Sequence, residues 1–118
     1  MSLPLNTFEK SLTFETDETC INHRVALRLV RSIISFRSNS EAILDIETIG
    51  PIIMNLATST SDDLTIMEVI EFIDLVFSKA SSCNFINQLC EFASNNIQLG
   101  RFIPICQRIF YHLSLIHI

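Results

Sequence analysis

Hydrophobic residues recur at every third or fourth position along most of this chain, which is the spacing of one face of an α-helix. One apolar stripe lies between Asn22 and Phe36, and it consists of Val25, Leu29, Val30, Ile33 and Ile34. A second lies in residues 64–79, where Ile66, Ile70, Ile73 and Phe77 are flanked by Val69, Phe72 and Val76. No segment alternates as a strand does, so the pattern predicts an all-α fold.

A polar break at FRSNSE, residues 36–41, ends the first of these helices. Ser38 or Ser40 is expected to cap a short helix with the sequence EAILDI. A second helix, TIGPIIMNLA, is expected to follow it, because Pro51 is tolerated in the first turn of a helix.

The polar loop TSTSDD precedes the long helix of residues 64–79, in which Thr65 and Glu68 have the spacing of a capping box. After the break SSCN, a further helix is predicted for the stretch FINQLCEFA. The loop SNNIQLG then leads to a last helix that is expected to begin near Pro104.

A shift of 43 residues superimposes two parts of this pattern. It places Leu29 on Phe72, Val30 on Ile73, Ile33 on Val76 and Ile34 on Phe77, and then Ala42 on Phe85, Ile43 on Ile86, Ile46 on Leu89 and Ile49 on Phe92. A long helix, a Ser/Asn-rich break and a shorter helix thus recur in the same order. A period of about 40 to 47 residues is typical of HEAT and armadillo repeats, which predicts a right-handed superhelix fragment of about two repeats.

The stretch SNSEAILDIETIGPIIMNLATSTSDDLTIMEVIEFIDLVFSKAS resembles an armadillo repeat. A short helix leads through a Gly50-Pro51 turn into a second helix, and a polar loop then leads into a long third helix, which is the order in that family. The family's glycine-rich turn is present here only as DIETIG. The resemblance implies a scaffold that binds other proteins.

The stretch HRVALRLVRSII resembles a segment of the N-terminal armadillo-like region of the Rictor family, the scaffold subunits of target-of-rapamycin complex 2. This narrower resemblance rests on Ala26, Leu27, Arg28, Leu29, Val30 and Arg31. It implies a role in assembling a kinase complex in growth signalling.

Composition supports one helical segment over residues 1–118 and limits the possible partners. Hydrophobic residues make up 48% of the 118 residues and charged residues 18%, which is too apolar for a disordered chain. The net charge of −5 argues against general affinity for nucleic acid. The apolar end RFIPICQRIFYHLSLIHI predicts a fragment of a longer chain, although the final LIHI could be a non-native extension.

Three features predict an intracellular protein, and the cytoplasm is its expected location. No apolar run reaches the roughly 18 residues that span a bilayer, so no transmembrane segment is expected. The N-terminal MSLPLNTFEKSL lacks the basic start and apolar core of a secretory signal. The four cysteines lie in apolar helical runs and are predicted to be reduced core thiols (Cys20, Cys83, Cys90 and Cys106).

Two rows of charged residues allow a functional and a structural interpretation. Arg24, Arg28 and Arg31 lie on one helix face, where guanidinium groups suit a phosphorylated or acidic partner. The shift of 43 residues instead places Arg28 on Glu71 and Arg31 on Asp74, which predicts ion pairs between neighbouring repeats. We favour this second interpretation. The acidic row of Glu68, Glu71 and Asp74 is accordingly expected to be a charged face rather than an acid–base pair.

No motif predicts catalysis, a cofactor or a metal ion, so the chain is not expected to be an enzyme. Cys83 and Cys90 are seven residues apart and His112 and His117 five, neither of which is a spacing typical of zinc ligands. A catalytic pair in which His112 activates Cys106 as a nucleophile has no better support from the sequence than a zinc site has. Two glycines, far apart, make no phosphate-binding loop.

The expected function is therefore a non-catalytic protein–protein interaction scaffold segment, whose partners are other protein subunits and adjacent helical repeats. One alternative is an armadillo-like scaffold of another large complex, in RNA processing or trafficking. Another is a small free-standing helical bundle that dimerises. Repeat arrays usually need about three repeats to be stable, so a segment of two repeats is expected to be marginally stable and to self-associate.

Overall fold

The structure is a computed structural model that describes residues 3–4, 15–80 and 82–116. The region assessed above for a secretory signal, apart from Leu3 and Pro4, and the final two residues lie outside this range. The described residues form helices and no strand, which confirms the all-α prediction. The elements are α2 (Asp17–Ser35), α3 (Asn39–Ser59), α4 (Asp63–Lys79), α5 (Asn84–Asn96), the 3-10 turn η1 (Gly100–Phe102) and α6 (Ile103–Ile116).

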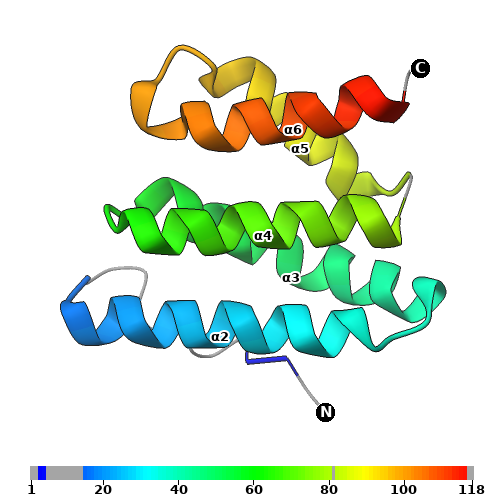
Figure 1. The fold of residues 1–118 in the computed structure, drawn as a ribbon, viewed down its shortest axis with the longest axis horizontal. Helices are drawn as coiled ribbons and strands as arrows, with labels where there is room; N and C mark the ends of the chain where they lie inside the picture. The colour runs from blue at the N-terminus through cyan, green and yellow to red at the C-terminus, as the bar shows by residue number, and fades with distance from the viewer. Residues whose placement is uncertain (1–2, 5–14, 81, 117–118) are drawn as a thin grey trace.

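The helices form two layers. Figure 1 shows α2, α4 and α6 side by side in one layer, called here the front layer, with α3 and α5 behind them as the back layer. The molecule measures 42 × 37 × 18 Å, and the short dimension matches two layers of helices whose axes lie roughly 8–10 Å apart. Successive helices thus alternate between the layers.

The hydrophobic core lies between the two layers. Burial of each large apolar side chain contributes about 1.5–3 kcal/mol, so this core is the main source of stability. Its largest fully buried members come from every helix: Leu27, Ile34, Ile46, Ile49, Ile53, Leu56, Phe72, Ile73, Phe85, Leu89 and Ile105.

The core-facing side of α2 differs from the predicted one. Val25 and Leu29 belong to the predicted stripe, but they are 57% and 42% exposed. Apolar residues surround much of this helix, and contacts with α3 and α4 select the arc that is buried. That arc consists of Cys20, His23, Ala26, Leu27, Val30, Ile33 and Ile34.

The prediction of two helices on either side of Gly50-Pro51 is wrong, because α3 runs without interruption and Pro51 lies inside it. Proline removes one backbone hydrogen bond and costs about 3 kcal/mol within a helix. Burial of the residues around it, including Ile49 and Ile53, offsets this cost. Ser38 is the N-cap, one of the two serines predicted. Because α3 is one continuous helix, this part of the chain lacks the three-helix order expected for an armadillo repeat.

The cap of α4 departs from the sequence expectation, and the start of α5 is capped by a residue of another helix. Asp62, not Thr65, caps α4, and its carboxylate accepts a hydrogen bond from the Thr65 backbone N–H at 3.2 Å. Thr65 is buried within the first turn. The N-cap residue of α5, Cys83, makes no side-chain cap bond. Glu47 of α3 instead accepts a hydrogen bond from the Phe85 N–H at 3.1 Å, so one back-layer helix caps the other.

Gly50 allows the closest approach between α3 and α5. A Cβ atom at this position would lie 2.6 Å from two carbons of the Phe85 ring. Phe85 is fully buried and packs against Phe72 with ring centroids 6.1 Å apart, so its ring has no free space into which to move. The absence of a side chain at Gly50 is therefore a packing requirement.

We predict that Gly50→Ala lowers the free energy of unfolding by about 1–3 kcal/mol, the usual cost of overpacking a core. The opposing gain in helix propensity is at most about 1 kcal/mol, so the clash should dominate. Urea denaturation followed by circular dichroism measures the effect.

Gly100→Ala is the matched control, because nothing lies within 4 Å of a Cβ at that position. It should change stability by no more than about 1 kcal/mol. Phe85→Leu in the Gly50→Ala background should recover part of the loss by shortening the opposing side chain. Equal stabilities of the two alanine variants would contradict the close approach.

Candidate functional site

Ion pairs join α2 to α4 along the line where these two helices meet, called here the α2–α4 seam. Arg28 Nε donates to Glu68 Oε1 at 2.9 Å, and Arg31 Nη2 donates to Glu68 Oε2 at 2.6 Å. Arg31 also lies 3.7 Å from Glu71. The Glu68 side chain is only 13% exposed and is shared by two guanidinium groups. It is therefore the central acceptor of the seam.

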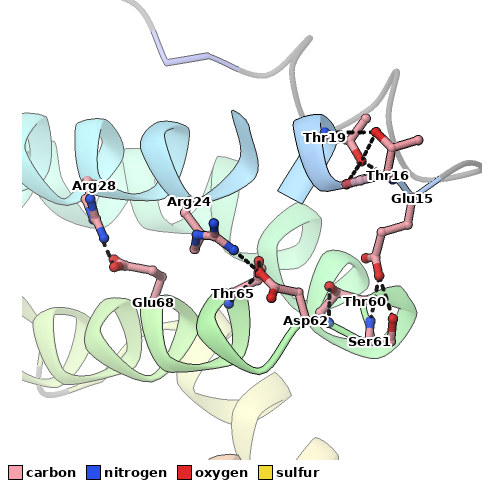
Figure 2. A network of polar contacts seen from close by, with 10 residues as sticks. All are labelled: Glu15, Thr16, Thr19, Arg24, Arg28, Thr60, Ser61, Asp62, Thr65 and Glu68. Carbon is pink, nitrogen blue, oxygen red and sulfur yellow. Dashed lines mark hydrogen bonds and ion pairs between the residues drawn. The ribbon is translucent and has the colours of Figure 1, made fainter. Parts of the chain in front are cut away.

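Figure 2 shows how the seam continues toward the start of α4. Arg24 pairs with Asp62, which also accepts from the Thr65 hydroxyl at 2.6 Å. Burial by itself raises the pKa of Asp62, but the bonds from Thr65 and Arg24 outweigh it and lower the pKa below its ordinary value. Nearby, Glu15 accepts from the Ser61 N–H at 3.0 Å and from its hydroxyl at 2.7 Å. Hydrogen bonding from the Ser61 and Thr60 side chains lowers the pKa of Glu15.

Asp74 belongs to a second line of contacts, the α4–α6 seam. It accepts from Arg108 Nη1 at 2.7 Å and lies 2.6 Å from His112 Nε2. The His112 ring also stacks on Phe77, with ring centroids 4.6 Å apart. Sequence reasoning missed Arg108 and His112 in this role, although their spacing of four residues places them on one helix face.

Five of the six charged residues singled out from the sequence thus form ion pairs along the α2–α4 seam, whereas Asp74 lines the groove beside that seam but makes its contacts with Arg108 and His112 of α6. The shift of 43 residues aligned Arg28 with Glu71, but Arg28 meets Glu68 instead. It also aligned Arg31 with Asp74, whereas Arg31 meets Glu68 and Glu71. The register differs by about one helical turn, because adjacent helices pack with a stagger that a sequence shift does not contain.

The front layer has a shallow groove beside each seam. The groove between α2 and α4 has a volume of about 550 Å³, and its walls include Arg28, Glu71 and Leu75. The groove between α4 and α6 has a volume of about 520 Å³, and its walls include Pro104 and Tyr111. Each groove combines apolar and polar groups, as surfaces that bind a peptide or a partner helix do.

Large apolar side chains are exposed on the outer faces of the front-layer helices. Single exposed apolar residues are normal, but a row of them on one helix face marks a contact surface. At α2 the exposed apolar residues are four or seven positions apart, which places them on one face of the helix. The exposed residues are Ile21, Val25, Leu29 and Phe36 at α2, Leu64 and Met67 on α4, and Ile103, Phe110, Tyr111, Leu115 and Ile116 on α6.

The cysteines are free thiols placed as packing residues. Burial raises the pKa of the Cys20, Cys83 and Cys106 thiols, which keeps them protonated and weakly nucleophilic at neutral pH. Within the described residues, no three His, Cys, Asp or Glu side chains are grouped so that they could hold a metal ion. In the same part of the chain, no helix is both long and apolar enough to cross a membrane.

The chain matches no protein-family model, and neither a curated protein nor a solved structure matches it. The armadillo, HEAT and Rictor resemblances thus rest on the residues quoted from the sequence. The structure adds an all-helical, two-layer architecture that is consistent with a helical repeat-like fold.

His23 is an ionisable side chain in the core, with 1% of its surface exposed. Burial lowers its pKa because the imidazolium form loses hydration, although the nearby Glu15 carboxylate acts in the opposite direction. The unfolded chain therefore binds a proton at this position more readily than the folded chain does. The contribution of neutral His23 to the free energy of unfolding is therefore fully present above the ordinary histidine pKa of about 6.5. It is lost as the pH falls toward the lower pKa that His23 has in the folded chain.

We predict that Glu68→Gln lowers the free energy of unfolding by about 1–2 kcal/mol, because it weakens two charge-assisted hydrogen bonds at a largely buried acceptor. Glu71→Gln, at a side chain that is 63% exposed, is the matched control and should change it by less than about 0.5 kcal/mol. Urea denaturation of the two variants at low and high salt measures both changes in the free energy of unfolding. Similar losses in the two variants would show that Glu68 has no special role in the seam.

We also predict that unfolding requires less free energy at pH 5.5 than at pH 7.5, and that His23→Gln reduces this difference. Asp62 and Glu15 have lowered pKa values, so both stay ionised across this window and cannot produce the change. Denaturation curves of the two proteins at both pH values supply the comparison. An identical pH dependence in His23→Gln would mean that the buried imidazole is not its source.

Proposed function

We propose that the chain is a non-catalytic protein–protein interaction segment of a larger intracellular scaffold of the armadillo/HEAT type. The alternation of successive helices between two layers supports this proposal, because stacked helix pairs have this arrangement in helical repeat proteins. Such arrays present one layer of helices as a continuous binding surface. The front layer is the corresponding surface here.

The observation that carries the proposal is the pair of grooves along α4. They run on either side of one helix, and the seams beside them hold α2, α4 and α6 together through ion pairs. Because Glu68 and Asp74 are engaged in those seams, the partner would be recognised by the more exposed groups, Arg28, Glu71 and Tyr111. A helix or an extended peptide with alternating apolar and charged residues has the chemistry to fit.

The resemblance to the Rictor family suggests the more specific proposal of a subunit of target-of-rapamycin complex 2. The quoted stretch lies in α2, where Ala26, Leu27 and Val30 are buried and Arg28 and Arg31 pair with Glu68. These residues therefore have packing roles in this chain, which any helical array of this kind would require. A scaffold in RNA processing or trafficking remains the alternative within the same class. The exposed apolar row of α2 favours the second alternative, a helical bundle that dimerises.

We predict that the double variant Glu71→Gln/Tyr111→Ala reduces binding to the partner by about tenfold or more while the fold is retained. The tagged chain is recovered from cells after crosslinking, and the bound proteins are quantified by mass spectrometry. An immunoblot for the target-of-rapamycin kinase tests the specific proposal. Absence of the kinase together with recovery of another defined complex would favour the alternative scaffold.

Thr48→Ala/Asn55→Ala is the matched control, because both side chains are exposed on α3 in the back layer. It should leave the recovered partners unchanged. If both double variants retain the same partners at the same level as the unmodified chain, the front-layer grooves are not the binding surface.

A further inference from the structure

We propose that two copies of this chain associate through α2, in an antiparallel arrangement about a two-fold axis between Arg28 and Leu29. This interface goes beyond the proposed function, since it is centred on the outer face of α2 and shares with the α2–α4 groove Arg28, beside the axis, and Ser32. The surface is the row of Ile21, Val25, Leu29 and Phe36, called here the α2 stripe. These four residues are 51%, 57%, 42% and 89% exposed.

The α2 stripe lies on one face of the helix and away from the seam. Its members are four or seven residues apart, so they project in similar directions, whereas Arg24, Arg28 and Arg31 turn toward α4. Figure 2 shows Arg24 and Arg28 reaching toward Asp62 and Glu68. The stripe extends from Ile21 to Phe36, which at 1.5 Å per residue is about 22 Å along the helix. It is thus long enough for a helix–helix contact.

The stripe is complementary to itself when the second copy is antiparallel. A two-fold axis between Arg28 and Leu29 places Ile21 opposite Phe36 of the second copy. It places Val25 opposite Ser32, so a larger side chain meets a smaller one. Residues Leu29, Ser32, Ile33, Phe36 and Arg37 line a hollow of about 370 Å³, which can receive an apolar side chain of the second copy.

Repulsion between the acidic ends of α2 disfavours the parallel direction. The exposed residues Asp17 and Glu18 lie at the start of α2, and Arg37 follows its end. In a parallel pair, the acidic ends of the two copies would meet and repel each other. In the antiparallel pair, the two acidic ends lie at opposite ends of the interface, so this mutual repulsion is removed, and the Glu41 and Asp45 carboxylates at the other end of each helix are paired with Arg37. The helix dipoles are also opposed, which is favourable.

The area of the stripe sets the expected strength. With Phe36 almost wholly exposed and the three aliphatic side chains about half exposed, the stripe offers apolar area on the order of 300–400 Å² per copy. Because interfaces are typically about 60% apolar, the total buried area would be roughly 1,100 Å². This value is at the lower limit for specific interfaces, so the dimer should be weak, with a Kd of about 1–100 µM.

Sedimentation equilibrium of the 118-residue chain tests the proposal, with monomer–dimer association expected in that range. Phe36→Asp should weaken association by at least tenfold, and circular dichroism should show unchanged helicity, because this side chain packs little in the monomer. Leu115→Asp, at an exposed apolar residue of α6, is the matched control and should leave the dimer intact. A chain that stays monomeric above about 300 µM, or that loses association equally in both variants, would overturn the proposal.

Disulfide trapping tests the arrangement. Leu29→Cys lies beside the proposed axis and should crosslink to itself under mild oxidation, since the two Cα atoms would be near enough for a bridge. Ile21→Cys should not crosslink to itself, because the two copies of residue 21 would be about 22 Å apart along the length of the helices. In a mixture with Phe36→Cys, however, Ile21→Cys should crosslink to residue 36 of the second copy. Self-crosslinking of Ile21→Cys would instead show a parallel pair and overturn the antiparallel proposal. None of these variants alters Glu71 or Tyr111, so this result and the test of the grooves stand separately.

Discussion

The arrangement of the back layer depends on the contact between Gly50 and the Phe85 ring. Because Gly50 has no side chain, α5 can approach α3 closely enough for Glu47 to accept the Phe85 N–H and cap α5. The same ring packs against Phe72 of α4, so one aromatic side chain connects both layers. A larger residue at position 50 would displace this ring, and with it the cap and the helix that follows.

The two layers are stabilised by different interactions. The back layer meets the front layer through apolar residues that exclude water, and the front-layer helices meet one another through ion pairs at their outer edges. Exposed ion pairs contribute little each, but the Glu68 and Asp74 side chains are 13% and 28% exposed, and each has two partners: two guanidinium groups for Glu68, and the Arg108 guanidinium and the His112 ring for Asp74. Charges of this kind fix the register of α2, α4 and α6 more than they add stability. Grooves lie beside these ion pairs, so the ion pairs and the proposed binding surface are on the same face of the molecule.

Particular residues show where the sequence was sufficient. The apolar residues predicted for the stripe of α4 and its flanks are all at least partly buried, because they are concentrated on one side of the helix. The centre of the buried face, however, is at the predicted flanks Val69, Phe72 and Val76, and Ile70 and Phe77 of the predicted stripe are only partly buried. Ser38 could be expected as a cap, because it follows a polar break and precedes a periodic segment. Pro51 was misleading, since its local cost predicts a helix start, while burial of its neighbours keeps α3 continuous. Val25 and Leu29 were also misleading, because the apolar residues of α2 are too widely spread to identify one face.

For the candidate site, the sequence by itself determined that three arginines share one helix face and that an acidic row occurs on another helix. These features follow from the helical period alone. The partner of each charge, the second seam formed by Arg108 and His112, and the grooves were decided by tertiary structure. The physical reason is that the stagger between adjacent helices results from how their side chains interlock, as at Gly50 and Phe85. That fit depends on residues distant in the chain, and no local pattern specifies it.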